Sequence, residues 1–335
     1  MSAPNVYDDE EQALLRATVR AIMDRESVGA EDAAAAAYVQ GALVDAGLME
    51  LRSPDEMGAA IATTATTLIV VEELGRCAAP GGYLGALLAT ELLRLCGATA
   101  AELEQLTVDA PVAVALSHDL VAFGQRGEIA VDCAVGATHA LTLDGATLAL
   151  APLTVPVDMA DPSRRMSEVG EPTALPYTMT PSTLESWTRF SELACAADLL
   201  GVASGALELA RSHAAQRVQF GRVIASFQAV QHLCARAWTR VEAMRSAVLY
   251  GSWAHDHGSP DASVATRVAK AYASTAAREV VYTAMQVIGG MAMTWEHPAH
   301  RRLRRVLLDR RLFGDEAFHQ AALANSRLAY HLEAS

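Results

Sequence analysis

One long run of apolar residues limits what the C-terminal half of this chain can fold into. Between residues 228 and 257, apolar side chains recur in steps of three and four, with no proline among them. This spacing places them along one side of an α-helix, and such a stripe is typical of the seam in a helical bundle. The residues of the stripe are Val230, Leu233, Ala237, Val241, Met244 and Val248.

Two further long helices are predicted beside this one. Residues 196–216 are rich in Ala and Leu and lack proline, and residues 261–288 again place apolar side chains on one side of a helix. A last helical segment is expected to begin at Pro298 and to break at Gly314. The side chains that share one side of the 261–288 helix are Val264, Val268, Ala271, Thr275 and Tyr282.

The N-terminal third of the chain also has helical spacing. Glycines end several of its apolar runs, as at Gly47 and Gly97, which is where helices commonly stop. The expected helices span 9–25, 31–47, 59–76, 83–96 and 99–106.

Strand-like patterns begin near Pro111. Short apolar runs are separated by glycines, and the Asp144-Gly145 pair between two of them signals a β-hairpin. The sequence therefore predicts a mainly α protein with an N-terminal helical domain over 1–109, a small, reduced β domain over 110–182 and a C-terminal four-helix bundle over 183–335. The expected strands lie at 112–116, 129–131, 140–143 and 147–151.

Charge and cysteine content exclude several classes of function. Acidic residues outnumber basic ones by 39 to 26, and the net charge of −13 disfavours binding to a polyanion such as nucleic acid. The five cysteines form no Cys-x-x-Cys pair, which indicates reduced thiols without a disulfide framework or a zinc site. The N-terminus has no secretory pattern, and no apolar stretch reaches the roughly 18 residues of a membrane helix. We therefore expect a cytoplasmic protein without a metal ion or membrane insertion.

Two polar clusters each allow a structural and a functional interpretation. His255 and His257 flank Asp256 at a helix end, which is either a solvated terminus or a metal site. A basic run near the C-terminus is either an ion-paired helix face or a contact for anionic phosphates or a partner chain. Its members are Arg301, Arg302, Arg304, Arg305, Arg310 and Arg311.

Residues 217–231 form the corner between two predicted helices. Gly221 breaks the incoming helix, and Ser226 is expected to cap the outgoing one. Arg217 therefore stands at the end of one helix, with the side-chain amides of Gln219 and Gln228 close in sequence. A planar cation, amides and the free N–H groups of a helix start suit a phosphate ester. The alternative is a plain helical corner with one salt-bridged arginine.

The same corner resembles a known family signature. Arg217-x-Gln219-Phe220-Gly221, followed by Phe227-Gln228, is similar to the R-x-x-F-G…(F/H)Q signature of acyl-CoA dehydrogenases. Other segments resemble this family in the same order along the chain. They are Ala46-Gly47-Leu48, Pro54-Asp55-Glu56-Met57-Gly58, Glu72-Glu73-Leu74-Gly75-Arg76 and Gln286-Val-Ile-Gly289-Gly290.

The resemblance implies FAD bound at a subunit interface. In this family a carboxylate removes the α-proton of an acyl-CoA thioester while the flavin accepts the β-hydride. By resemblance, Arg217, Gln219 and Gln228 serve the diphosphate and ribityl region of FAD, in a signature that includes Phe220 and Phe227. Gln286, Gly289 and Gly290 serve the adenosine end of an FAD that is seated mainly on a neighbouring subunit.

The catalytic base of the family has no counterpart here. The position that the family usually gives to a Glu, late in the chain, is occupied by Phe313. An alternative base position used by some members falls on Ser191, with Glu192 one residue away and therefore about 100° around the helix. Asp315 and Glu316 remain as displaced candidates for the base.

A shortened family member without a base resembles one chain of bacterial α2β2 acyl-CoA dehydrogenases, notably those acting on steroid side chains. We therefore expect a subunit that contributes FAD contacts to a full-length homologue, which supplies the base and binds most of the acyl-CoA. Two alternatives remain: a scaffold subunit that binds no cofactor, and a self-sufficient homomeric dehydrogenase.

Overall fold

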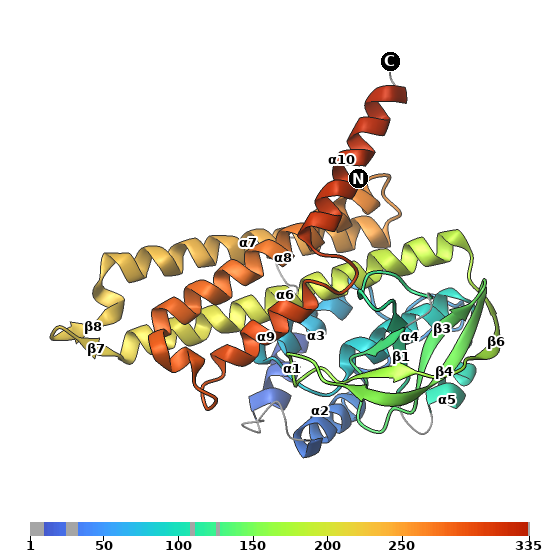
Figure 1. Cartoon of the computed structure of the whole chain (residues 1–335), viewed down its shortest axis with the longest axis horizontal. Helices are drawn as coiled ribbons and strands as arrows, with labels where there is room; N and C mark the ends of the chain where they lie inside the picture. Colours follow the sequence, from blue (N-terminus) through green and yellow to red (C-terminus); the bar gives the residue numbers. More distant parts are fainter. Residues whose placement is uncertain (1–9, 25–32, 108–110, 125–127, 334–335) are drawn as a thin grey trace.

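The computed structural model describes residues 10–24, 33–107, 111–124 and 128–333. Helices from the N-terminal part pack beside a long helical bundle, and a β-sheet lies at one end of that bundle (Figure 1). The expectation about a secretory signal and the predicted boundary at 109–110 both rest on residues outside the described ones.

The N-terminal part is helical, as predicted. Its third helix begins at Thr64, later than predicted, because the hydroxyl of Thr63 caps it by accepting a hydrogen bond from the Thr66 N–H. The carboxylate of Asp256 accepts from the Thr64 N–H at 2.9 Å, which gives this residue of the His255–His257 cluster a structural role. The helices are α1 (Glu10–Asp24), α2 (Ala33–Asp45), α3 (Thr64–Cys77), α4 (Tyr83–Leu95) and α5 (Ala100–Thr107).

The β-sheet closes on itself. Its strand order is β3-β1-β2-β5-β4-β6, and β3 also pairs with β4, so that five strands form a barrel with β6 added at the edge of β4. The last two strands were not predicted. β5 spans only four residues, and Pro172 and Pro176 interrupt the apolar alternation around β6, an edge strand, where proline is tolerated. The strands are β1 (Ala113–Leu116), β2 (Ile129–Val131), β3 (His139–Asp144), β4 (Thr147–Val157), β5 (Met166–Val169) and β6 (Thr173–Thr178).

The C-terminal bundle is built on three long helices that run side by side, while a fourth packs against two of them and the last extends away from the body (Figure 1). The helices are α6 (Pro181–Gln216), α7 (Gln228–Asp256), α8 (Ala262–Ile288), α9 (Ala299–Asp309) and α10 (Glu316–Glu333).

Helix α6 is the core helix of the molecule. By length and composition it could cross a membrane, but 83% of its most apolar window is buried inside the fold. Gly201 and Gly205 let α3 approach it closely: an added Cβ would lie 1.9 Å from the carbonyl oxygen of Glu72 or of Arg76, respectively. Any side chain at these two positions would push the N-terminal helices away from the bundle.

The predicted seam of α7 faces the core. Ala237, Val241, Met244 and Val248 are buried, whereas Val230 and Leu233 are partly buried. The apolar side predicted for α8 mostly faces outward, because the buried side of this helix consists mainly of alanines with a few polar residues. We call the outward side the outer stripe of α8; it comprises Val264, Val268, Tyr272 and Tyr282, which are 46%, 44%, 38% and 50% exposed.

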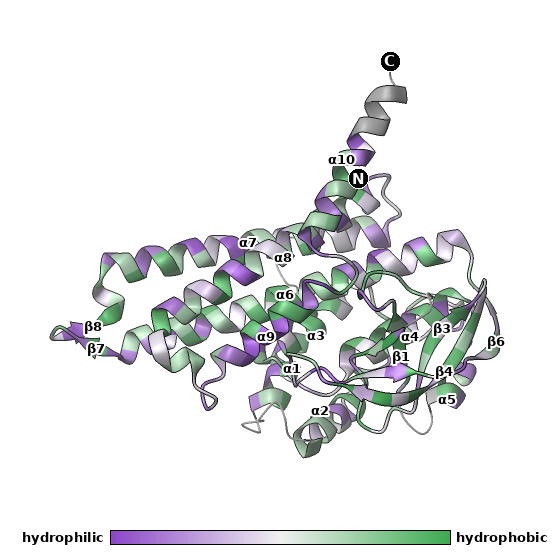
Figure 2. Ribbon diagram, viewed as in Figure 1, coloured by the Kyte–Doolittle hydropathy of each residue, from purple (hydrophilic) through white to green (hydrophobic). Residues whose placement is uncertain are grey.

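Helix α9 carries most of the basic run and is hydrophilic, although it lies against α6 and α8 (Figure 2). Arg302 and Arg305 are 8% and 2% exposed. Arg304, also on α9, lies 4.7 Å over the ring of Trp295, and beyond the helix Arg310 pairs with Glu316. Much of the run is therefore an ion-paired or packed helix face.

Candidate functional site

The corner between α6 and α7 is a tight β-hairpin. β7 (Val218–Gln219) pairs antiparallel with β8 (Arg222–Val223), and Phe220 and Gly221 between them have positive φ angles of 52° and 75°. Two successive left-handed residues match the type of turn that closes two-residue hairpins. The sequence predicted the break at Gly221 but not the hairpin, because a two-residue strand carries no periodic signal.

The start of α7 differs from the prediction as well. The Ser226 hydroxyl donates to the Val223 carbonyl at 2.7 Å within a 3-10 turn, η1 (Ile224–Ser226), so Ser226 is not the N-cap. Phe227 takes that position without a side-chain cap. The first N–H groups of α7 therefore lack a side-chain acceptor, which leaves them available to an external one.

Arg217 is the C-cap residue of α6 and is exposed, as are Gln219 and Gln228. Among the described residues, neither the Arg217 nor the Gln228 side chain has a hydrogen-bond or ion-pair partner, whereas Gln219 Nε2 donates to the carbonyl of Val218 at 2.7 Å. The alternative interpretation, in which Arg217 forms a salt bridge, is therefore not supported, because no acidic side chain pairs with Arg217 among the described residues.

The second FAD-type motif lies at the same end of the bundle as this hairpin (Figure 1). Gln286 is exposed near the end of α8, and Gly289, its C-cap, has a φ of 76° that disfavours any other residue. Gly290 has no such constraint, and a Cβ added there would meet nothing within 4 Å. The small size of Gly290 therefore serves no contact inside the described chain and leaves room for a group from outside.

We call this end, formed by the β7–β8 hairpin and the 3-10 turn η2 (Gly289–Met293), the bundle tip. It combines exposed cations, among them Arg217 and Arg222, with exposed apolar side chains, an unusual pairing on a chain of net charge −13. Its exposed apolar residues include Val218, Phe220, Met291, Met293 and the adjacent Trp295.

The two family base positions are far apart in sequence but meet at Trp187. The Ser191 hydroxyl donates to the Trp187 carbonyl at 2.8 Å, and the Phe313 ring lies edge-on to the Trp187 ring with centroids 5.5 Å apart. Phe123 packs on Trp187 at 4.8 Å, and the indole N–H donates to the Leu88 carbonyl. Ser191 and Trp187 are 0% exposed and Phe313 is 2% exposed, so side chains fill this position.

Buried side chains of Lys270 and His319 contact the backbone of the turn that carries Phe313, and we call these contacts the clamp. Phe313 has a φ of 59°, a strained value for this residue type. Lys270, the only lysine of the sequence, donates to the carbonyls of Arg310 and Gly314 at 3.0 and 2.8 Å, and His319 Nε2 lies 3.0 Å from the Phe313 carbonyl. Sequence reasoning missed this clamp; a lone lysine inside an Ala-rich helix was its signal.

The remaining carboxylates near this turn are already engaged. Asp315 accepts backbone hydrogen bonds from Phe318 and Ala317, and the Phe318 N–H is the main cause of its lowered pKa. Burial alone would raise the pKa of Glu316, but the ion pair with Arg310 outweighs it and the pKa is lowered. A depressed pKa weakens either group as a base. Glu192 differs from these two: burial raises its pKa to about 7, and its carboxylate lies 4.0 Å from His319 Nδ1, beyond hydrogen-bond distance. Glu192 is 5% exposed, so an acyl-CoA could reach it only if the surrounding side chains moved.

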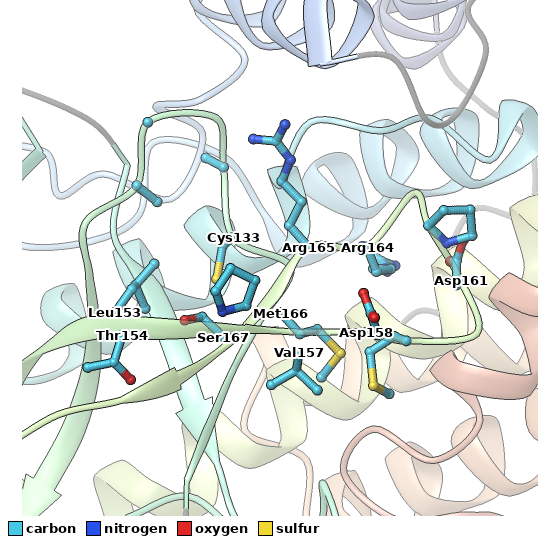
Figure 3. A pocket seen from close by; sticks show the side chains of 16 residues that line it. Cys133, Leu153, Thr154, Val157, Asp158, Asp161, Arg164, Arg165, Met166 and Ser167 are labelled. Atoms are coloured by element: carbon cyan, nitrogen blue, oxygen red, sulfur yellow. The ribbon is translucent and has the colours of Figure 1, made fainter.

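Sequence reasoning also missed a cluster of buried ionic residues at the junction of the three parts, which we call the junction network. Two of its members, Asp161 and Arg164, line a cavity of about 530 Å³ beside β4 and β5. Arg164 and Asp161 lie at one end of that cavity, and Leu153 and Thr154 at the other (Figure 3). The network comprises Arg164, Arg305, Asp132, Asp161, Asp198 and Asp309.

Two sequence profiles of one family match the chain. The profile described as acyl-CoA dehydrogenase, N-terminal domain, matches residues 9–107, and the one described as acyl-CoA dehydrogenase, C-terminal domain, matches residues 186–328. Acyl-CoA dehydrogenase IpdE2 of Mycobacterium tuberculosis is 32% identical over 307 residues, which cover 88% of this chain and 91% of that protein. FadE34 of the same organism is 31% identical over 86% of this chain and 42% of its own length.

Solved structures share the fold. The Tcur3481-Tcur3483 steroid ACAD variant superposes with a TM-score of 0.81 at 25% identity, covering 97% of this chain and 99% of the matched one. The ChsE4-ChsE5 complex from Mycobacterium tuberculosis gives a TM-score of 0.80 at 19% identity, with the same coverage of both chains.

Proposed function

This chain belongs to the acyl-CoA dehydrogenase family, and from that premise we propose that it is a subunit of a flavoenzyme. Its bundle tip contacts an FAD that is bound mainly by a full-length homologue. One observation carries the proposal. Both base positions, Ser191 and Phe313, are buried and lack a carboxylate, while the positions that match the FAD motifs are exposed, apart from the half-buried Phe227. A chain with a complete acyl-CoA site of its own would be expected to carry a carboxylate at one of the two base positions.

The tip has the chemistry that a dinucleotide requires. When bound, FAD would supply the hydride acceptor for α,β-desaturation of an acyl-CoA. Arg217 would bind the diphosphate with its planar guanidinium, and the uncapped N–H groups of α7 lie in the same corner. Gln286 and the open backbone at Gly289–Gly290 would receive the adenosine end. The base would come from the partner.

The relatives support an assembly of two different chains. The steroid ACAD Tcur3481-Tcur3483 and the ChsE4-ChsE5 complex are each named for two components. We propose an α2β2 tetramer with a family homologue encoded nearby, acting on a bulky acyl-CoA of the steroid side-chain type.

Co-expression tests the proposal directly. We expect the chain purified alone to carry little or no FAD and to show no dehydrogenase activity, whereas the pair with its genomic neighbour should show flavin absorbance and turnover. Stoichiometric FAD and turnover from the chain alone would establish a homomeric enzyme instead. If replacing Arg217 changes neither the FAD affinity nor the melting temperature of the pair, the chain is a scaffold.

The outer stripe of α8 is the surface on which we expect the partner to dock. Its exposed residues follow helical spacing, and a cavity of about 470 Å³ that includes Tyr272 lies between α7 and α8. Replacing Val268 and Tyr282 by Glu should abolish co-purification of the partner, because two charges would be buried without counterions.

The matched control for this variant is Leu14→Glu, a charge introduced at a 68% exposed leucine on α1. It should leave the assembly intact. Light scattering of the co-purified pair gives the oligomeric state. A tetramer that persists in the double variant would place the interface elsewhere.

A further inference from the structure

The junction network joins three parts of the chain through two arginines. Asp132 follows β2, Asp161 and Arg164 lie between β4 and β5, Asp198 is on α6, and α9 supplies the other two members. Every member is at most 5% exposed. Ion pairs at this depth are only weakly screened by solvent, so their charge balance matters.

Arg164 is the centre of the network. Its Nε and Nη2 donate to both carboxylate oxygens of Asp309 at 3.1 Å, and its Nη1 pairs with Asp132 at 2.9 Å. The same Nη2 lies 3.1 Å from Asp198. One guanidinium therefore contacts three carboxylates.

Arg305 contacts a different set. Its Nε donates to Asp161 at 2.7 Å, and its Nη2 donates to the Ala79 carbonyl at 2.8 Å and to the Ser163 hydroxyl. Its Nη1 reaches Asp198 only at 3.5 Å. Asp161 thus has a cationic partner at 2.7 Å, whereas Asp198 has one at 3.1 Å that it shares with Asp309 and another at 3.5 Å.

The charges do not balance. Two guanidiniums face four carboxylates, and both cations are shared. Asp132 has additional support, since it accepts the Leu84 and Gly85 N–H groups at the start of α4. Asp198 and Asp309 have no helix start of this kind, and their carboxylates share one nitrogen of Arg164, which lies 3.1 Å from each. Among the described residues, Asp198 Oδ2 is buried and accepts no hydrogen bond. A proton held by the pair would remove one of the two crowded charges and would give this oxygen a donor, because a protonated carboxyl group can donate one hydrogen bond.

We propose that Asp198 and Asp309 share one proton, and that this proton stabilises the junction of the three parts in a pH-dependent way. While the proton is present, the pair carries one negative charge and the network is nearer to neutrality. When the proton leaves, a second charge appears at the point where the β-barrel, the N-terminal helices and the bundle meet. The inference is independent of FAD and of any partner.

The groups that face Asp309 come from each element packed on it. They are Arg164 from the β4–β5 connection, Asp198 and Cys195 from α6, Lys270 from α8 and Arg305 from α9 itself. Burial raises the pKa of Asp309 to about 7 against the opposing effect of Arg164, and Asp198 raises it further. A folded-state pKa above the unfolded value means that the folded chain binds more protons in between, so this group's contribution to stability is lost as pH rises from about 4 to about 7.

Urea unfolding of the full chain across pH 5 to 9 tests the proposal against the variant Asp309→Asn. Other titrating groups are common to both proteins and cancel in the comparison. We expect the ratio of the wild-type to the variant unfolding constant to rise about tenfold per pH unit between pH 5 and 7 and then to level off. A ratio that does not change with pH would overturn the proposal. Glu185→Gln, which removes a surface carboxylate paired with Arg189, should keep the wild-type slope.

Infrared spectroscopy gives a second measurement. At pH 6 the wild-type chain should show a carboxylic-acid carbonyl band that disappears above pH 7, with the contribution of Glu192 cancelled in the difference from Asp309→Asn. If Asp309→Asn does not fold, Asp198→Asn serves instead, because it should also remove the shared proton. An Asp198→Asn protein that keeps both the band and the slope would contradict the sharing.

Discussion

Replacing Arg305 by alanine is expected to destabilise the folded chain by about 3–5 kcal/mol, because the substitution leaves buried carboxylates without their cation. Asp161 would lose its 2.7 Å partner at 0% exposure, and Asp198 would lose one of two cations. The Ala79 carbonyl would also lose its bond from the guanidinium. Against a typical total of about 5–15 kcal/mol, this loss should leave a marginally folded protein. Chemical denaturation followed by circular dichroism measures it.

Two further variants distinguish the effect of leaving a buried carboxylate unpaired from the effect of losing the packed arginine side chain. Adding Asp161→Asn to Arg305→Ala removes the unpaired carboxylate and should restore part of the stability. Arg311→Ala removes an exposed arginine two residues beyond the end of α9 and should change stability by no more than about 0.5 kcal/mol. If Arg305→Ala unfolds at the wild-type denaturant concentration, the junction network contributes little to the fold.

Arg217→Ala should weaken FAD retention in the assembled complex and leave the fold intact. A charge-assisted bond to a phosphate is worth roughly 1.5–3 kcal/mol, which corresponds to a rise of about ten- to a hundredfold in the FAD dissociation constant. Arg217 is exposed and has no side-chain partner among the described residues, so its removal should cost little stability. FAD titration beside a melting curve of the same complex gives both quantities.

Arg217→Lys keeps the charge without the planar fork and should rescue FAD binding only in part. Arg222→Ala is the matched control, because Arg222 lies in the same hairpin but its guanidinium stacks 4.0 Å over the Phe227 ring. A sharp fall in melting temperature of Arg217→Ala with unchanged FAD affinity would make Arg217 a structural residue.

Apolar spacing predicted the helices well and their orientation less well. The seam of α7 is buried as expected, although larger side chains of the same helix, such as Trp238, remain exposed. On α8 the buried side consists mainly of alanines, with Lys270 and, toward its C-terminal end, Val280 and Val281. Val264, Val268 and Tyr282 lie on the outside. Periodicity shows that residues share a side of a helix, but not which side another chain would cover.

The site was predicted to the extent that it depends on local motifs. The family signature singled out Arg217 and Gly290, whose exposure fits the proposed roles, and the absence of a carboxylate at Phe313 is visible in the sequence. What could not be predicted depends on contacts between distant segments. Phe313 reaches Trp187, and Arg164 reaches Asp309, only after separate parts of the chain have packed together.

The clamp behind Phe313 gives the chain an unusual chemical property. Lys270 is its only side-chain amine, and it is 0% exposed. Reagents that acylate amines would therefore find no accessible lysine on the folded chain. Acylation of Lys270 requires the 310–314 turn to open, so the rate of that labelling reports how often the position occupied by Phe313 becomes accessible, with no engineered probe.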